Sequence, residues 1–143
     1  MSHLDKFAPH ELTVAEYQYW VVTARGKQIT PGDLVVLPRV AYESFADVEA
    51  EPAVELFTVL GQLEKVALGK LGAHRINVIA AMMKDPFVHF HFFPRFEGTV
   101  DRFGKSWVDE DWPRAITLRD VETSSEVLAA VKSFYAESLA AQG

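Results

Sequence analysis

The chain contains no cysteine, which excludes disulfide bonds and thiolate metal sites. It has no apolar run near the roughly 20 residues that a membrane-spanning helix needs, and it begins with no signal peptide. Basic residues are outnumbered 14 to 20 by acidic ones, and the resulting net charge of −6 argues against a nucleic-acid groove. We therefore expect a cytoplasmic protein whose partners include neither a membrane nor nucleic acid.

What is present is an ordinary globular composition, 49% hydrophobic and 24% charged. Without repeats or a linker, residues 1–143 are expected to form a single domain with a substantial core. Residues 84–86 (Lys-Asp-Pro) supply a turn, so the segments that flank them are expected to pair as antiparallel strands. Clusters of β-branched and aromatic residues predict four strands, at residues 17–23, 33–37, 75–81 and 87–93.

Two segments have the apolar spacing of amphipathic helices. The first covers residues 52–71, with Pro52 in its first turn and Gly72 just past its end. The second is a C-terminal helix that begins near Thr123 and Glu126, which have the spacing of a capping box. A long helix between strand pairs, with more strands and a final helix after it, predicts an α+β fold around an antiparallel sheet.

The segment from His89 to His91 carries the strongest chemical signal. Residues two apart in a strand project from one face, so the two imidazoles point the same way while Phe90 and Phe92 point to the other side. The simpler alternative is a pair of polar residues on a solvated strand face. Because only five of the 143 residues are histidine, we favour a functional pair.

The same segment resembles a family signature. Residues 87–95 read Phe-Val-His-Phe-His-Phe-Phe-Pro-Arg. This is similar to the His-φ-His-φ-His-φ-φ motif of the histidine triad (HIT) superfamily, where φ is apolar and Pro-Arg often follows. The Pro-Arg pair sets the register, so His89 takes the middle position, His91 the third, and Phe87 stands where the first histidine is usual.

Flanking segments extend the resemblance over residues 32–107. Residues 32–39 resemble the family's glycine–strand–Pro-Lys segment, Asn77 matches a strand asparagine, and Trp107 lies where many relatives carry a tryptophan. Two further parts of the chain depart from the pattern in addition to Phe87. Ala41 stands where a histidine usually follows Pro-Lys, and Met82 and Met83 replace an element that helps to hold the α-phosphate.

The resemblance implies nucleotidyl transfer at the α-phosphate of a nucleotide conjugate, such as a dinucleoside polyphosphate or a nucleoside phosphoramidate. His89 would attack the phosphorus to form a nucleotidyl-histidine, and His91 would donate a hydrogen bond as negative charge develops. No cofactor is required by that route, although Mg²⁺ can accompany a polyphosphate. The resemblance also implies a homodimer. The substitutions leave a second reading open, a catalytically weak or inactive nucleotide-binding protein on the same fold.

Four residues are candidates for nucleotide contacts. Asn77 is expected near ribose or phosphate, and Arg95 near phosphate. Phe87 is placed to stack on a base, and Trp107 comes from the polar, irregular segment 97–114. Each has a structural alternative: a solvent-face asparagine, a surface ion pair, and core packing for the two aromatic residues.

In metal-binding proteins of another class, the two histidines of a His-x-His motif serve as metal ligands. A cupin presents two histidines in this way, and Glu97 follows six residues after His91, so a two-histidine, one-carboxylate site is conceivable. The glutamate lies beyond the usual spacing, no later motif supplies another histidine, and a cupin has no use for the helix at 52–71. We therefore expect no metal site.

Overall fold

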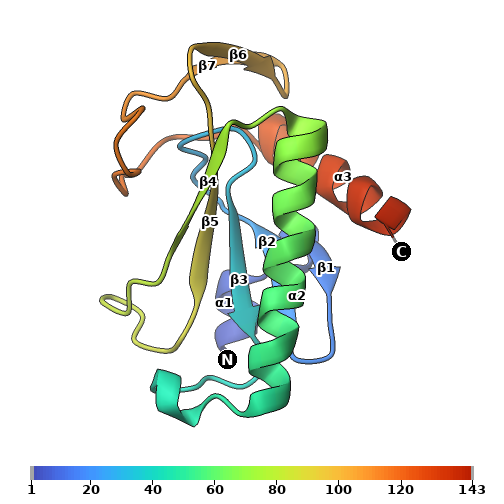
Figure 1. The fold of residues 1–143 in the computed structure, drawn as a ribbon, viewed down its shortest axis with the longest axis vertical. Helices are drawn as coiled ribbons and strands as arrows, with labels where there is room; N and C mark the ends of the chain where they lie inside the picture. Colours follow the sequence, from blue (N-terminus) through green and yellow to red (C-terminus); the bar gives the residue numbers. More distant parts are fainter. Residues whose placement is uncertain (1, 143) are drawn as a thin grey trace.

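The computed structural model describes residues 2–142 and contains a five-stranded antiparallel sheet. The strand order is β1-β2-β3-β5-β4, so β5 lies inside the sheet and β4 forms one edge (Figure 1). The strands are β1 (Thr13–Glu16), β2 (Trp20–Ala24), β3 (Leu34–Pro38), β4 (Arg75–Ile79) and β5 (Phe90–Arg95). The predicted α+β class is confirmed, as is the antiparallel pairing of β4 with β5.

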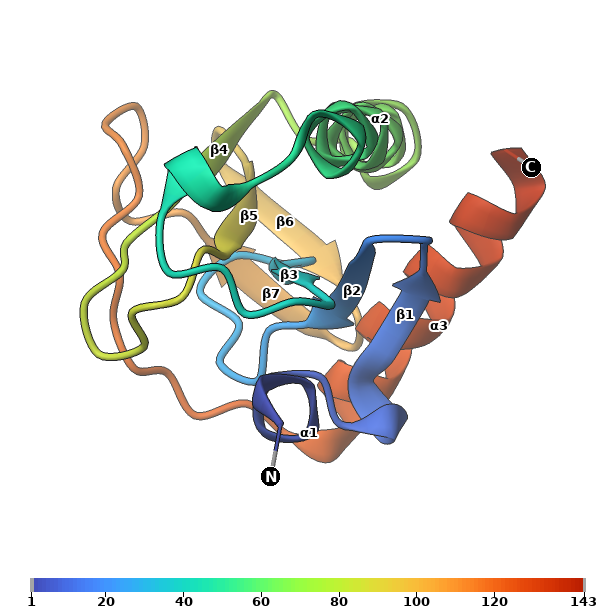
Figure 2. The same cartoon turned by 90° about the horizontal axis from the view of Figure 1, so that it is seen from below.

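One face of the sheet is covered by the long helix α2 (Ala50–Val66) (Figures 1 and 2). The helix continues as one π-helical turn, Ala67–Leu71, and ends at Gly72, whose φ of 85° is readily adopted by glycine. Its apolar stripe packs onto the sheet, and the indole N–H of Trp20 donates to the carbonyl of Pro52 at 2.7 Å. The helix predicted at 52–71 is therefore confirmed, although the observed helix begins two residues earlier, at Ala50.

The C-terminal helix α3 (Ser125–Gln142) packs against β1, β2 and α2. Its Tyr135 is fully buried and donates to the carbonyl of Gly32 at 2.7 Å. Gly32 has a φ of 96°, and a Cβ there would lie 2.7 Å from Leu71 Cδ2, so this contact requires glycine.

The predicted capping box at the start of α3 is wrong. The hydroxyl of Ser124, not Thr123, accepts from the backbone N–H of Val127 at 3.2 Å. Thr123 instead accepts from the backbone N–H of Gln28 at 2.9 Å, a contact across 95 residues that local spacing cannot reveal.

The sequence predicts that residues 97–114 are irregular, and this is only partly correct. They contain a hairpin, β6 (Thr99–Arg102) and β7 (Lys105–Val108), in which Val100 pairs with Trp107. The connecting residues Phe103 and Gly104 both have positive φ, the geometry of a tight hairpin turn. A phenylalanine is uncommon in that conformation, so Gly104 is the only turn signal that the connecting residues carry.

Other strand boundaries also differ from the predictions. Residues 17–19 form the turn between β1 and β2, closed by the Tyr17 N–H donating to the Trp20 carbonyl at 2.8 Å. Their aromatic composition predicts strand, which is wrong, and the sequence pattern gives no prediction for β1. The strand predicted at 87–93 begins only at Phe90 and runs on to Arg95.

The N-terminal segment lies on the side of the sheet opposite α2. It contains the short helix α1 (His3–Phe7) and a 3₁₀ turn, His10–Leu12 (Figure 2). A second 3₁₀ turn, Phe45–Asp47, precedes α2. No helix in residues 2–142 has the length and apolar character needed to cross a membrane.

Candidate functional site

A row of aromatic rings lies on the face of the sheet opposite α2. Neighbouring ring centroids in the row are 5.0, 5.0, 5.2 and 6.1 Å apart. On the α2 side, Phe90 lies 6.0 Å from Trp20 and Phe92 is in the core. The predicted alternation of faces is therefore confirmed, although the row begins before β5 does. In order, its members are His3, Phe87, His89, His91 and Phe93.

His89 is held in a defined tautomer. Its Nδ1 lies 2.7 Å from the carbonyl oxygen of Phe87, which can only accept, so Nδ1 carries the proton. In the neutral form of the ring Nε2 is then unprotonated, and no hydrogen bond links it to residues 2–142. His89 is 6% exposed, so solvent competes little with this arrangement. A neutral imidazole with one nitrogen fixed and the other free is equipped to act as a nucleophile or base.

The surroundings of His91 keep its ring neutral at physiological pH. Burial, the nearby charge of Arg25 and the adjacent His89 lower its pKa from 6.5 to about 4, with Asp85 opposing the shift. Its Nδ1 is a buried polar atom without a partner in the described part of the chain. An unpaired buried nitrogen is costly and is usually found where a ligand or water completes the site.

Phe87 lies in the row between His89 and a residue to which the sequence gave no role. The ring of His3 is 5.0 Å from that of Phe87, and its Nε2 donates to the carbonyl of Pro38 at 2.6 Å. The helix α1 thereby brings a third imidazole to the end of the row. Phe87 contributes an apolar ring next to the two site histidines.

Asn77 and Arg95 form a hydrogen-bonded network at the Phe93 end of the ring row, where Asn77 is the strand partner of Phe93. Arg95 is 2% exposed and forms a bidentate ion pair with Asp109, with Nε–Oδ2 and Nη2–Oδ1 distances of 2.6 and 2.9 Å. Its Nη1 donates to Asn77 Oδ1 at 2.6 Å, and that oxygen also accepts from the backbone N–H of Ile116 at 3.0 Å. The side chains predicted to meet ribose and phosphate thus have protein partners, and they fasten β4 and β5 to the segment after β7.

Trp107 is also placed in the protein interior. It is 6% exposed, belongs to the main hydrophobic core, and donates its indole N–H to the carbonyl of Arg102 at 2.8 Å. The structure therefore supports the packing alternative for Trp107 and gives it no contact with the histidines.

A basic cleft of about 350 Å³ lies beside His91, on the side of the neighbouring strand β3, and His91 and Val35 both line it. Its charged lining residues are Lys6, Arg25 and Lys27, and Pro9, Leu12 and Val35 contribute apolar surface. The Arg25 guanidinium lies 5.5 Å from the Phe93 ring centroid. In a chain of net charge −6, this local set of cations is suited to an anionic ligand.

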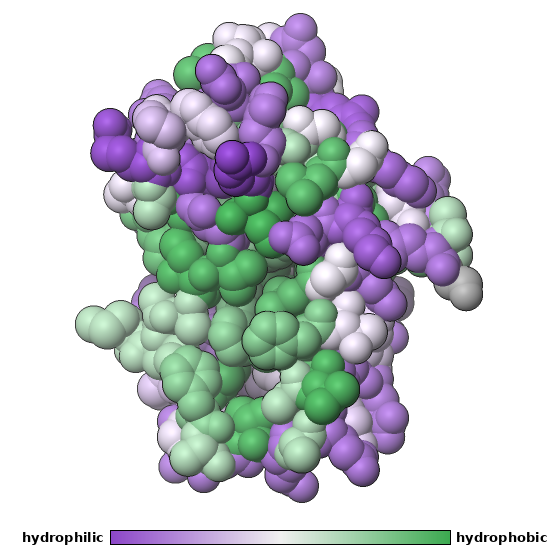
Figure 3. All heavy atoms as spheres, viewed as in Figure 1, coloured by the Kyte–Doolittle hydropathy of each residue, from purple (hydrophilic) through white to green (hydrophobic). Residues whose placement is uncertain are grey.

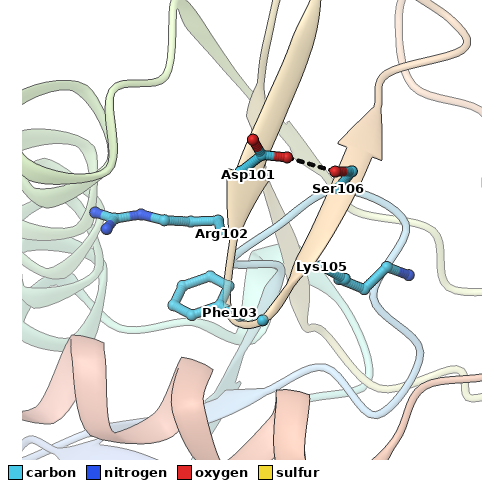
Figure 4. Close-up of a pocket in the computed structure, with 6 residues that line it drawn as sticks. Asp101, Arg102, Phe103, Lys105 and Ser106 are labelled. Atoms are coloured by element: carbon cyan, nitrogen blue, oxygen red, sulfur yellow. Dashed lines mark hydrogen bonds between the residues drawn. The ribbon is translucent and has the colours of Figure 1, made fainter.

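A larger hollow of about 550 Å³ surrounds the tip of the β6–β7 hairpin (Figure 4). It is formed by six consecutive residues, with Ser106 hydrogen-bonded to Asp101. The Arg102 side chain extends away from this hydrogen bond and donates to the carbonyl of Lys70. The hollow contains no histidine of the row, and we assign the site to the histidine face instead.

The alternative of a metal site gains no support from the geometry. Glu97 lies past the end of β5, where its backbone N–H donates to His74 Nδ1 at 3.2 Å. Among the described residues, no three histidine, aspartate or glutamate side chains converge as metal ligands.

Comparison with solved structures places this geometry in context. No protein-family model matches the sequence, and neither does any curated protein. Solved structures do match the fold. A histidine triad protein from Marinobacter aquaeolei superposes with a TM-score of 0.77, over 99% of this chain and 98% of that one, at 19% identity. The chain has the histidine triad fold.

Two further histidine triad structures support that assignment. A protein from Bradyrhizobium japonicum has a TM-score of 0.72 over 97% of this chain and 96% of its own, at 16% identity. A hypothetical histidine triad nucleotide-binding protein from Sulfolobus tokodaii has a TM-score of 0.66 over 91% and 84%, at 15% identity. The architecture predicted from the signature in residues 87–95 is therefore confirmed, while the low identities leave the chemistry to be argued from this chain's own residues.

Sequence reasoning missed three residues that shape this candidate site: His3, Arg25 and Asp109. His3 and Arg25 come from segments that carried no motif, and only the fold brings them beside the row. For Asp109, a buried arginine at the end of a strand implies an acidic partner, but nothing in the sequence indicates which one.

We predict that Asp109→Asn lowers the free energy of unfolding by about 3–5 kcal/mol, because it leaves the buried Arg95 charge unpaired. Urea denaturation measures the loss. The matched control is Glu16→Gln, which breaks the exposed Arg39–Glu16 pair and should cost less than about 1 kcal/mol. Equal effects of the two substitutions would contradict the assigned role of the buried pair.

We also predict that the His91 ring titrates near pH 4 in NMR spectra. In the unfolded chain it binds a proton near pH 6.5, so the stability it contributes is present above pH 6.5 and is lost as the pH falls toward 4. The difference in unfolding free energy between wild type and His91→Asn should therefore shrink over that interval. His10→Gln, at an exposed position, is the control. A difference that is constant with pH would show that His91 is not held neutral by the fold.

Proposed function

We propose that the protein binds a nucleotide on its histidine face and transfers the nucleotidyl group through His89. The reaction is attack at the α-phosphate of a nucleotide conjugate, either a dinucleoside polyphosphate or a nucleoside phosphoramidate. The observation that carries the proposal is the 2.7 Å hydrogen bond from His89 Nδ1 to the Phe87 carbonyl, which leaves Nε2 unprotonated. The nucleotide-binding histidine triad neighbour from Sulfolobus tokodaii supports the choice of ligand.

The two histidines are suited to different steps. His89 Nε2 provides the electron pair for the bond to phosphorus, and water later displaces the histidine. His91, 5.2 Å away between ring centroids and neutral, offers one N–H to a phosphate oxygen on which negative charge develops. The route uses no cofactor, and Mg²⁺ would enter only with a polyphosphate substrate.

The phenylalanine at position 87 leads us to expect slow turnover of the nucleotide conjugate. Where histidine is usual in the first position, it supplies no hydrogen-bond donor, and removing one such donor from an active site costs about 10²–10³ in rate. This is the specific observation behind a second candidate function, a nucleotide-binding protein that has lost most of its chemistry. Phe87 and the apolar part of the basic cleft are the surfaces we propose for the base.

We predict that an adenosine phosphoramidate, followed by an acid-free quench, gives wild-type protein whose intact mass is raised by one adenylyl group. His89→Asn should give no adduct, because the amide side chain cannot attack phosphorus. The reaction is run with EDTA and again with Mg²⁺, and the rates of labelling should agree.

Calorimetry with AMP separates the remaining outcomes of that experiment. An adduct of equal yield on His89→Asn would show that His89 is not the nucleophile. AMP binding without any adduct would favour the second candidate function. Absence of both would contradict nucleotide binding altogether.

The same fold leaves an apolar surface that we propose as a homodimer interface. The outer side of α2 exposes Val54 and Phe57, which are 69% and 76% accessible, beside the edge strand β4. Figure 3 shows apolar surface across this side of the molecule. A groove of about 670 Å³ separates α2 from β4, with Phe45, Leu60 and Val78 among its lining residues. A two-fold axis would pair these surfaces with their own copies and cover the free edge of the sheet.

We predict that Phe57→Asp converts the protein from a dimer to a monomer of 16.0 kDa in light scattering after size exclusion. The charged side chain would be buried without a partner at the centre of the interface. Val108→Asp is the control, because Val108 is also exposed, at 62%, but lies on the β6–β7 hairpin. A wild type that elutes as a 16.0 kDa species would contradict the proposed dimer.

A further inference from the structure

A buried glutamine holds the loop between β2 and β3 in one shape. Gln28 is 1% exposed, and its Oε1 accepts from the backbone N–H groups of Gly32 and Asp33 at 3.0 and 2.9 Å. Its Nε2 donates to the carbonyls of Arg25 and Asp33 at 2.7 and 2.8 Å. A primary amide has two N–H donors and two acceptor sites, so the hydrogen-bonding capacity of this side chain is fully used. All four bonds lie within the loop, and together they join its two ends.

One end of this loop carries a charge that acts on the histidine site. The Arg25 backbone N–H donates to the Asp33 carbonyl at 2.9 Å, so both polar groups of the Arg25 main chain are bonded. The guanidinium lies 5.5 Å from the Phe93 ring centroid and donates to the Lys27 carbonyl. After burial, its charge is the largest cause that lowers the pKa of His91. The position of the loop therefore determines the electrostatic field at His91.

The other ionisable groups around His91 act less strongly. The histidine before it in the row lowers its pKa less than Arg25 does, and Asp85 opposes both. Lys6 and Lys27 line the same cleft, and each forms an ion pair with an aspartate, at 3.4 and 3.1 Å. Arg25 is therefore the charged group whose position has the greatest effect on His91.

The loop is also bonded to the C-terminal part of the chain. The backbone N–H of Gln28 donates to Thr123 Oγ1 at 2.9 Å, in the segment that precedes α3. Tyr135 of α3 donates to the Gly32 carbonyl in the same loop at 2.7 Å. A continuous set of hydrogen bonds thus runs from Thr123 through Gln28 to the main chain of Arg25.

We propose that Gln28 and Thr123 are positioning residues of the histidine site, which hold the Arg25 charge beside His91. This role rests on the proposed function, in which His91 donates to a phosphate oxygen that gains negative charge. Neither residue belongs to the ring row, and both act through Arg25. A cation that is held in place before the substrate binds favours the developing charge without a cost of reorganisation.

The test is the titration of the His91 ring, followed by NMR. Thr123→Val keeps the shape of the side chain and removes the oxygen that accepts from Gln28, so the loop should loosen. The His91 midpoint should then rise from about 4 by about 0.5–1 pH unit, because a mobile Arg25 exerts a weaker field and water reaches the ring more easily. Gln28→Met, which is neutral and removes all four side-chain bonds, should give a larger rise.

Ser124→Ala is the matched control. The Ser124 hydroxyl accepts from the backbone N–H of Val127 at 3.2 Å, so its loss weakens the start of α3 without removing a bond to the loop. The His91 midpoint should not move in this variant. In an Arg25→Gln background, Thr123→Val should lose most of its effect on that midpoint, because the charge that it positions is absent.

Three results would overturn the proposal. The first is an equal rise in Ser124→Ala, which would show a general loosening of the C-terminal part of the chain. The second is an unchanged titration in Thr123→Val, which decides the outcome alone if Gln28→Met does not fold. The third is a rise that is undiminished in the Arg25→Gln background.

The proposed transfer is judged separately, by labelling the wild type with adenosine phosphoramidate. Absence of an adduct together with the expected rise in the His91 midpoint would contradict the transfer chemistry and still support the positioning of Arg25. An adduct on the wild type without that rise would support the transfer and overturn the positioning role.

Discussion

The two-sided packing of β5 is the constraint on which both the fold and the site depend. Phe90 and Phe92 point toward α2, and Phe92 is wholly buried in the core. The intervening His91 and Phe93 point to the other face, with His89 just before the strand. Because the side-chain period of a strand is two, a register shift of one residue would exchange core and site completely. At the end of the strand, the Arg95–Asp109 pair ties this register to the segment after β7.

The electrostatics of the site depend on the segments that cover the sheet face opposite α2. The face opposite α2 is overlaid by a short N-terminal helix and by the loop that carries Arg25, so His89 and His91 are poorly hydrated without being part of the apolar core. Partial burial favours the neutral imidazole, which is the nucleophilic form. The same burial strengthens the field of Arg25, in a protein whose net charge would otherwise repel a polyphosphate. A site with a neutral His91, a fixed His89 tautomer and a positive charge nearby is suited to the proposed attack on phosphorus.

The sequence predicts those parts of the molecule whose signals are local. The helix at 52–71 has a sustained apolar period and a glycine stop, and it forms with nearly those limits. The His89-x-His91 spacing places both rings on one face because strand geometry requires it. Prediction from local sequence pattern fails where contacts between residues far apart in the chain determine the structure. Thr123 is used by Gln28 rather than as a cap, and a phenylalanine in a positive-φ turn hides the β6–β7 hairpin. Asn77 and Arg95 fit the family pattern, but their partner Asp109 is recognisable only in the folded chain.

The central claim is that the Phe87 carbonyl fixes the His89 tautomer so that Nε2 attacks phosphorus. It is tested most directly by locating the bond in the adenylylated protein. Protein labelled with ¹⁵N in its histidine rings is adenylylated, and coupling between phosphorus and ring nitrogen is measured by NMR. The account predicts coupling to Nε2 of His89, with Nδ1 still protonated and bonded to the Phe87 carbonyl. Coupling to Nδ1, or to any other histidine, would contradict it.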